Sequence, residues 1–173
     1  MLKEISDILN RIPEAKLDAF ADILFNHCTH RIYIIGNGGS SATASHFVGD
    51  LSALGYDAIC LSDNVPRLTA ITNDYGWEDV YKRQMQHIKE DDILIAISVH
   101  GGSDDWSNNL AQATDFALKS GAKVLSLTGF DGGFLARNSD LDITVPAQDT
   151  YIVEGIHSIL THVIWKKLED LHK

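Results

Sequence analysis

The sequence predicts a doubly wound, three-layer α/β domain, in which a parallel β-sheet lies between two layers of helices. Short apolar runs rich in β-branched residues alternate with longer segments of helical periodicity, and glycine-rich turns follow several of these runs. Strands that alternate with helices form βαβ units, whose strands are parallel and whose helices cover both faces of the sheet. No repeat, linker or change of composition divides the 173 residues, so we expect one domain over 1–173.

The first 28 residues are expected to form two helices ahead of an α/β core at 29–173. Apolar side chains recur at helical spacing in 2–10 and again in 14–28. Pro13 separates these segments, because the residue before a proline is restricted to extended backbone.

Five apolar runs in the remaining chain are predicted to be strands. They are 31–35, 58–61, 92–97, 122–127 and 141–145. The segments between most of them are predicted to be helices, at 40–54, 75–89 and 106–119, and a long final helix is expected at about 150–171. Ser120 and Gly121 provide a stop for the helix at 106–119.

Composition argues against several classes of partner. The net charge of −10, with scattered basic residues, disfavours nucleic-acid binding. No apolar run approaches the length of about 20 residues that a membrane span needs. The chain begins with alternating charged and apolar residues, so we expect a cytoplasmic protein without a signal peptide. Cys28 and Cys60 belong to no C-x-x-C pair and are expected to be buried free thiols.

The loops after residues 35, 97 and 127 are expected to form the functional site. Ligands of such sheets bind beyond the carboxyl ends of the strands, where the strand order reverses. The three loops read Gly-Asn-Gly-Gly-Ser-Ser (36–41), Ser-Val-His-Gly-Gly-Ser (98–103) and Thr-Gly-Phe-Asp-Gly-Gly (128–133). Small and polar residues at all three strand ends indicate a site built largely from backbone and hydroxyl groups.

The first loop has the features of an anion site. Its glycines permit a close approach of backbone to ligand, and Ser40 or Ser41 can cap the following helix, whose first N–H groups attract negative charge. Two such turns at one crevice suit a sugar phosphate. A dinucleotide cofactor is disfavoured because Ser41 occupies the third glycine position of that fingerprint. The alternative to an anion site is a tight turn that binds no ligand.

Two helices carry candidate metal or acid–base residues. His46 and Asp50 are four residues apart and therefore share one helix face, although such a pair alone is more often a surface ion pair. Glu154, His157 and His162 interrupt the apolar final helix, and for His157 a structural role is favoured. Glu154 and His162 lie about 12 Å apart along an ideal helix. For these two residues to bind one ion, the helix would have to bend, the two side chains would have to reach the ion from opposite sides, or neighbouring subunits would have to contribute ligands.

A further candidate is the segment 71–79, where Asn73 and Asp74 could hold hydroxyl groups. An Asx turn that caps the next helix is an equally good interpretation. Aromatic residues are expected to serve packing and not ligand stacking. They are Tyr75, Trp77, Tyr81, Trp106 and Trp165.

Taken together, these motifs resemble the sugar isomerase (SIS) domain, and within it the phosphoheptose isomerase (sedoheptulose 7-phosphate isomerase) family. The matching motifs are Gly-Asn-Gly-Gly-Ser (36–40), His-Phe-x-x-x-Leu (46–51), Asn-Asp-x-Gly (73–76), Ile-Ser-x-x-Gly-x-Ser (97–103) and Leu-Thr-Gly-x-Asp-Gly-Gly (127–133), with a closing helix that carries His157 and His162. The resemblance covers nearly the whole chain. It implies a flavodoxin-like five-stranded parallel sheet, a homotetramer with sites at subunit interfaces, and zinc-dependent aldose–ketose isomerisation through an enediol, feeding heptose synthesis for surface polysaccharide.

The resemblance also implies roles for individual residues. The residues that it places at the substrate are Asn37, Gly38, Gly39, Ser40, Asn73, Asp74, Ser98, Val99, His100, Ser103 and Glu154. Among these, Ser98 and Ser103 correspond to phosphate ligands. The implied metal ligands are His46, Asp50, Glu154 and His162, and Asp50 with His162 correspond to the acid–base pair.

Three departures from the family pattern bear on these roles. The chain has Asp50 where members commonly carry Glu, and Glu154 where they carry Gln. In the phosphate loop, Val99 and His100 replace Thr and Ser, so two hydroxyl groups are lost and an imidazole is gained. We expect His100 to donate a hydrogen bond to the anion.

These departures keep two alternatives open. One is isomerisation of a phosphosugar other than sedoheptulose 7-phosphate. The other is a SIS-domain binding protein without catalysis, similar to the replication-initiator-associating members of this fold.

Overall fold

The computed structural model describes residues 1–27, 29–103 and 105–173, and within them it confirms the predicted fold class. Five parallel strands form one sheet in the order β2-β1-β3-β4-β5. The strands are β1 (Ile32–Gly36), β2 (Ala58–Cys60), β3 (Ile93–Ile97), β4 (Lys123–Gly129) and β5 (Leu141–Val145). Their bounds agree with the predicted runs to within two residues.

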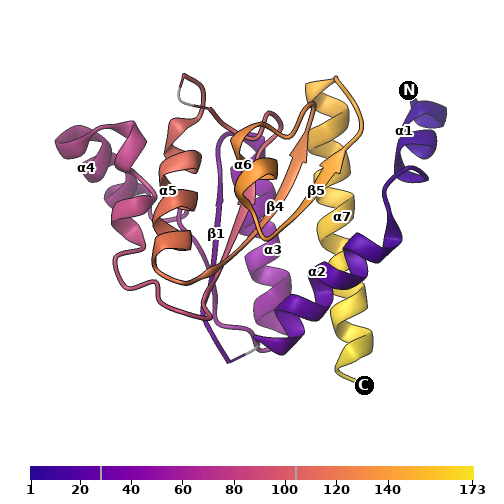
Figure 1. The fold of residues 1–173 in the computed structure, drawn as a ribbon, viewed down its shortest axis with the longest axis horizontal. Helices are drawn as coiled ribbons and strands as arrows, with labels where there is room; N and C mark the ends of the chain where they lie inside the picture. The colour runs from indigo at the N-terminus through magenta and orange to yellow at the C-terminus, as the bar shows by residue number, and fades with distance from the viewer. Residues whose placement is uncertain (28, 104) are drawn as a thin grey trace.

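Helices cover both faces of the sheet. One layer contains α1 (Leu2–Leu9), α2 (Glu14–Asn26), α3 (Gly39–Ala53) and α7 (Thr150–Leu171). The other contains α4 (Val65–Tyr75), α5 (Asn108–Lys119), α6 (Gly133–Asn138) and the 3₁₀ turns η1 (Trp77–Asp79) and η2 (Lys82–Gln84). Figure 1 shows α4 and α5 on one side of the molecule and α2 and α7 on the other.

The core is divided by the sheet into two apolar clusters. Ile32 and Ile34 of β1 belong to the cluster under α2, α3 and α7, whereas Tyr33 and Ile35 belong to the cluster under α5. Successive side chains of a strand point to opposite faces, so both faces must be apolar when both are covered. This requirement explains the continuous apolar runs in the sequence.

The strand order reverses between β1 and β3. The chain runs from β1 outward to β2 and then returns to β3 on the other side of β1. Gly36 and Ile97, at the carboxyl ends of β1 and β3, are register partners. The loops that leave these two strands in opposite directions open a crevice between them, which is where ligands of this fold class bind.

Three local features differ from the prediction. No helix spans 75–89. Instead α4 ends at Tyr75 and is followed by η1 and η2. Asn64 accepts a hydrogen bond from Arg67 N, and Pro66 lies in the first turn, so α4 begins with ordinary start signals. The short helix α6 was not predicted, and Gly38, with φ of 57°, precedes α3 as its N-cap in place of Ser40 or Ser41.

The aromatic residues divide into two groups. Tyr81 is buried, and Trp165 donates from Nε1 to Asp50 O at 3.0 Å, so the packing prediction holds for these two. Tyr75, Trp77 and Trp106 are 54%, 42% and 64% exposed, although their rings contact Arg83, Tyr81 and His100 respectively.

Cys60 is a buried free thiol, as predicted, and burial raises its pKa. Cys28, the other predicted buried thiol, lies outside the described residues. No helix in the described parts of the chain is long and apolar enough to cross a membrane.

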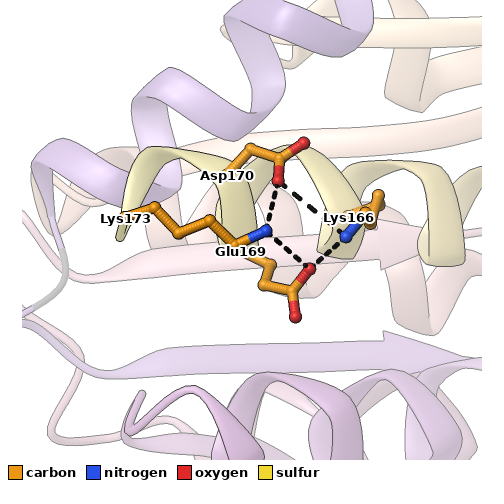
Figure 2. Close-up of polar contacts among 4 residues, drawn as sticks. All are labelled: Lys166, Glu169, Asp170 and Lys173. Carbon is orange, nitrogen blue, oxygen red and sulfur yellow. Dashed lines mark hydrogen bonds and ion pairs between the residues drawn. The ribbon is translucent and has the colours of Figure 1, made fainter.

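Charged side chains form ion pairs on the surface at the end of α7. Lys166 and Lys173 pair with Glu169 and Asp170, as Figure 2 shows. Glu169 and Asp170 have lowered pKa values because the lysines donate hydrogen bonds to them. Such exposed pairs add little stability. Lys167, in contrast, forms ion pairs with Glu14 and Asp18 of α2 and so connects α7 to α2.

His157 has a structural role, as favoured from the sequence. It is fully buried on α7, and its Nε2 lies 3.0 Å from the carbonyl oxygen of Thr128 on β4. A carbonyl only accepts, so Nε2 carries the proton and donates. Nδ1 has no partner among the described residues. Burial lowers the pKa of His157 from 6.5 to about 4, so the ring is neutral in the folded protein.

We expect His157 to make stability depend on pH. Between pH about 4 and 6.5 the unfolded chain binds a proton here and the folded protein does not. The stabilisation is therefore complete above about pH 6.5 and is lost as pH falls toward 4, by about 3 kcal/mol in total. Urea denaturation from about pH 7 to pH 5 should show a steeper fall for the wild type than for His157→Gln, which can donate without titrating. Equal slopes would contradict this role.

Candidate functional site

A pocket of about 230 Å³ lies at the carboxyl ends of β1 and β3. Its walls come from the loop after β1, the loop after β3 and one side chain of α7. The lining residues are Asn37, Gly38, Gly39, Ser40, Ser98, Val99, His100, Trp106, Ser107 and Glu154. Most of the predicted substrate residues are therefore brought together at the reversal of strand order.

The first turn of α3 forms one wall of this pocket. Gly38 has φ of 57°, which lets the chain turn sharply from β1 into the helix, and Gly38, Gly39 and Ser40 all line the pocket. The unpaired N–H groups of a helix start carry partial positive charge. This wall can therefore bind an anion such as a phosphate.

The second loop lines the pocket with one of its two predicted serines. Ser98 lines it and accepts a hydrogen bond at Oγ from Gly101 N at 3.1 Å. Ser103 Oγ accepts from Trp106 N at 2.9 Å, so this serine closes a turn and is not part of the lining. Ser107 lines the pocket instead, with φ of 53° at the start of α5.

His100 forms an aromatic wall of the pocket together with its neighbours. Its ring centroid lies 4.2 Å from that of Phe130 and 5.3 Å from that of Trp106. These contacts hold the imidazole plane beside the cavity, where one ring nitrogen can donate to an anion. Trp106 also lines the cavity and exposes most of its surface, so it offers a flat apolar face to a ligand.

The third loop and the start of α6 support the second loop and do not line the pocket. Leu135 N donates to Gly101 O and Phe134 N donates to Gly102 O, both at 2.9 Å. A Cβ atom on Gly101 would lie 1.9 Å from Gly132 O, so only glycine allows this approach. Residues 128–133 are not among the lining residues, and Phe130 of this loop contacts the ring of His100, which is one of them.

A buried network that the sequence did not reveal fixes the first loop. Asn37 and Asn109 exchange two side-chain hydrogen bonds, at 2.9 and 3.0 Å. The Tyr81 hydroxyl lies 2.5 Å from Gly36 O and 3.1 Å from Asn37 Oδ1. Burial raises the pKa of Tyr81, so its hydroxyl keeps its proton. Asn37 Oδ1 is engaged by both partners, which leaves Asn37 one amide hydrogen for a ligand.

Helices α3 and α7 pack side by side in parallel, and their contacts recur at helical spacing. Thr43 Oγ1 lies 3.1 Å from Ser158 Oγ, and His46 Nε2 lies 3.0 Å from His162 Nε2. Gly39 contacts Glu154 at one end of this row, and Asp50 contacts Trp165 at the other. The row aligns residues that are more than 100 positions apart in the chain.

Within this row, three residues form a group that fits a divalent metal ion. The group is His46, Asp50 and His162, and one ligand atom of each lies within 4.8 Å of the others. Asp50 Oδ2 lies 3.5 Å from His46 Nε2 and 3.8 Å from His162 Nε2.

The spacing and burial of the three ligand atoms agree with those of a metal-binding site. Ligands about 2.0–2.1 Å from a tetrahedral zinc ion are about 3.4 Å apart, close to the distances between these atoms. Asp50 Oδ2 is buried without a hydrogen-bond partner in the described structure, as expected of an atom that a cation would satisfy. Three protein ligands and one open position are typical of catalytic zinc.

Glu154 lies outside this group, although the resemblance implied a metal ligand there. Its carboxylate lies against Gly39, where an added Cβ would be 1.6 Å from Glu154 Oε1. Glu154 lines the pocket at the strand ends and also a groove of about 460 Å³ between α3 and α7, which His46 lines too. The carboxylate therefore lies between the anion pocket and the histidine group.

Asn73 and Asp74 are not brought to the site. Both are exposed in the last turn of α4, and Asn73 Nδ2 donates to Asp74 Oδ1 at 2.8 Å. They also do not form the predicted Asx cap of a following helix, because Gly76 holds the N-cap position of η1.

Comparisons with known proteins agree with the geometry. The family model of the SIS domain matches residues 68–164. The phosphoheptose isomerase of Helicobacter pylori strain P12 is 38% identical over 80% of this chain and 74% of that protein. The phosphoheptose isomerase of Geobacter sulfurreducens is 30% identical over 96% of this chain and 91% of that protein. The structure of phosphoheptose isomerase GmhA from Neisseria gonorrhoeae superposes with a TM-score of 0.89 at 28% identity, over 98% of this chain and 92% of that one.

The Tyr81 network predicts a specific cost of removing one hydroxyl. Tyr81→Phe leaves the ring packed but removes the hydroxyl that donates to buried Gly36 O, and it leaves Asn37 Oδ1 with Asn109 as its remaining donor. We expect the free energy of unfolding in urea to fall by about 1–3 kcal/mol. Tyr75→Phe is the matched control, since Tyr75 is 54% exposed and lies outside the pocket, and it should change stability by no more than about 0.5 kcal/mol. An equal effect of both substitutions would show that the network does not stabilise the loop.

Proposed function

The chain belongs to the phosphoheptose isomerase family of SIS-domain proteins, and from this premise we propose that it interconverts sedoheptulose 7-phosphate and D-glycero-D-manno-heptose 7-phosphate. One observation carries the proposal. Glu154 lines both the anion pocket at the strand ends and the α3–α7 groove that contains His46. A phosphosugar held by its phosphate in the pocket can thus extend its carbonyl end toward carboxylate and imidazole groups.

The phosphate is held at the start of α3 and by the second loop. The α3 N-terminus supplies N–H groups, Ser98 and Ser107 supply hydroxyls, and His100 supplies a ring N–H. Asn37 donates its remaining amide hydrogen to a sugar hydroxyl. Asn73 and Asp74 are exposed on α4 and lie outside the pocket of the single chain.

The group His46, Asp50 and His162 holds a divalent ion, which the resemblance identifies as zinc. Such an ion polarises a sugar carbonyl and stabilises the negative charge that develops on its oxygen. Both histidine side chains are more than half exposed, at 61% and 57%, so the side of the group away from the core is open to a ligand.

The assembly and location follow from the same family. A homotetramer with sites at subunit interfaces would cover Tyr151, which is exposed beside the α3–α7 groove. A cytoplasmic location agrees with the substrate, since a doubly charged sugar phosphate does not cross a lipid bilayer unaided.

A second candidate function is isomerisation of another phosphosugar. The observation that favours it is the aromatic wall of His100 and Trp106, which lies where the resemblance implies hydroxyl ligands. The non-catalytic alternative has less support, because a purely binding role gives no reason for a metal-type group beside the pocket.

The proposal predicts zinc-dependent turnover. Purified protein loaded with zinc should convert sedoheptulose 7-phosphate, followed by NMR of the sugar C1 and C2 protons, and should lose activity on chelation. His46→Ala should lose the bound ion and reduce kcat about a hundredfold or more, since an ion supplies several kcal/mol of transition-state stabilisation.

His87→Ala is the matched control for this experiment. His87 lines a cavity with Arg31 and Lys89, which are not part of the site, so zinc content and rate should both be unchanged. Folded, zinc-loaded protein that converts no sedoheptulose 7-phosphate would contradict the proposal, and conversion of a different phosphosugar would support the second candidate.

A further inference from the structure

Asn109 lies behind the pocket and contacts its first loop. Its side chain is fully buried in the first turn of α5 and is not part of the pocket lining. Two side-chain hydrogen bonds, at 2.9 and 3.0 Å, join it to Asn37. Asn37, in contrast, is half-buried and lines the pocket. Asn109 can therefore act on a ligand through Asn37 without touching the ligand itself.

The backbone of α5 sets the orientation of the Asn109 amide. An asparagine side chain can exchange its oxygen and nitrogen by rotation, and the neighbouring donors and acceptors decide between the two arrangements. Leu110 N lies 3.0 Å from Asn109 Oδ1 and donates to it. A backbone N–H only donates, so the Asn109 oxygen must stay on this side. The Asn109 nitrogen is then left to face Asn37 Oδ1.

Asn109 in turn sets the orientation of Asn37. If the Asn37 amide were turned over, its nitrogen would face the Asn109 nitrogen and its oxygen would face the Asn109 oxygen, so both hydrogen bonds would be lost. The Tyr81 hydroxyl, 3.1 Å from Asn37 Oδ1, favours the same orientation. Asn37 Oδ1 thus accepts from two donors, and one hydrogen of Nδ2 goes to Asn109. Asn37 presents one N–H donor to the pocket.

A donor that is fixed before binding is worth more to a ligand than a mobile one. A loose asparagine would have to be ordered when the ligand binds, and this ordering would subtract from the binding free energy. The oxygen of a sugar hydroxyl can accept from the fixed N–H of Asn37. The phosphate has other partners, at the start of α3 and in the second loop. The effect of Asn109 should therefore fall on the sugar part of the ligand.

We propose that Asn109 is a positioning residue for the substrate, an inference that rests on the proposed isomerase function. It holds the Asn37 amide so that the free N–H of Asn37 donates to a hydroxyl oxygen of the sugar. This hydroxyl does not react, so its contact is the same before and during isomerisation. Such a contact lowers KM and leaves kcat nearly unchanged.

The test is a double-mutant cycle on zinc-loaded protein with Asn37→Ala, Asn109→Ala and the two together. Calorimetry gives the dissociation constant for sedoheptulose 7-phosphate, and turnover gives KM and kcat. We expect each single substitution to raise the dissociation constant and KM about three- to tenfold, as for the loss of one hydrogen bond. The double variant should bind as weakly as Asn37→Ala and no weaker, because Asn109 acts through Asn37. In all three variants kcat should stay within about threefold of wild type.

Inorganic phosphate and a stability control separate positioning from a general loosening of the pocket. Phosphate that displaces the sugar should bind Asn109→Ala within about twofold of wild type, since it does not use Asn37. Ser126→Ala is the control variant. Ser126 Oγ is buried on β4, donates to Asp142 Oδ1 at 2.7 Å and lies outside the pocket lining. Its loss should destabilise the fold to a comparable degree and leave the affinity for the sugar phosphate unchanged.

Tyr81→Phe provides a second route to the same test if Asn109→Ala does not fold. It removes one of the two donors to Asn37 Oδ1 and keeps the size of the side chain. We expect a rise in the dissociation constant that is smaller than that of Asn109→Ala and that disappears when Asn37 is already alanine. A rise of equal size in both backgrounds would contradict the proposal.

The outcomes distinguish this inference from the function on which it rests. Asn109→Ala that binds the sugar phosphate within twofold of wild type overturns the role of Asn109, and so do additive losses in the cycle or an equal loss of affinity for inorganic phosphate. Each of these results leaves the isomerase function intact when the wild type turns over. Wild type that binds sedoheptulose 7-phosphate without converting it overturns the function, while the cycle still decides the role of Asn109. Wild type that does not bind the sugar phosphate overturns both.

Discussion

The parallel packing of α3 against α7 is the constraint on which the site depends. Four contacts recur along this helix pair, from Gly39 with Glu154 at one end to Asp50 with Trp165 at the other. Because Gly39 has no side chain, α7 can place a carboxylate directly over the start of α3. The same register places His46 opposite His162, 3.0 Å apart. A shift of either helix by one residue would separate every chemical group of the site.

Other elements hold this register by independent means. His157 donates from α7 to the Thr128 carbonyl on β4, which fixes the rotation and height of α7 above the sheet. On the opposite face, Tyr81 and Asn109 hold Asn37, so the first loop leaves β1 in one direction. The pocket is therefore rigid where it would grip a phosphate. The more exposed aromatic wall around Trp106 is the part of the pocket where substrate choice can vary.

The sequence was sufficient for the fold class, the five strands and the position of the crevice, because these follow from apolar periodicity and from glycine-rich turns at strand ends. It was also sufficient to pair His46 with Asp50, since helical spacing alone puts them on one face. It misplaced α4, because the apolar spacing at 75–89 favours a helix there, whereas Asn64 and Pro66 start the helix at Val65. Ser107 was missed because Ser103 matched the family motif, yet only the turn made by Ser103 and Trp106 decides which serine faces the pocket.

Contacts between segments that are distant in the chain could not be predicted from the sequence. The bonds of Asn37 with Asn109 join residues 72 positions apart, and no local pattern signals them. The same is true of Glu154, whose separation from the metal-type group and closeness to Gly39 depend on how two helices align. The family pattern suggested one shared role for Asp50, Glu154 and His162. The structure separates Glu154 from the other two.

A crystal structure of the protein with zinc and sedoheptulose 7-phosphate is the measurement that tests this account most directly. The account predicts the phosphate at the start of α3 beside Ser98 and Ser107, the metal on His46, Asp50 and His162, and the side chain at position 154 within hydrogen-bond distance of C1 or C2 or their oxygens. A sugar bound outside the β1–β3 crevice would contradict the account. So would a metal ion bound away from His46, Asp50 and His162.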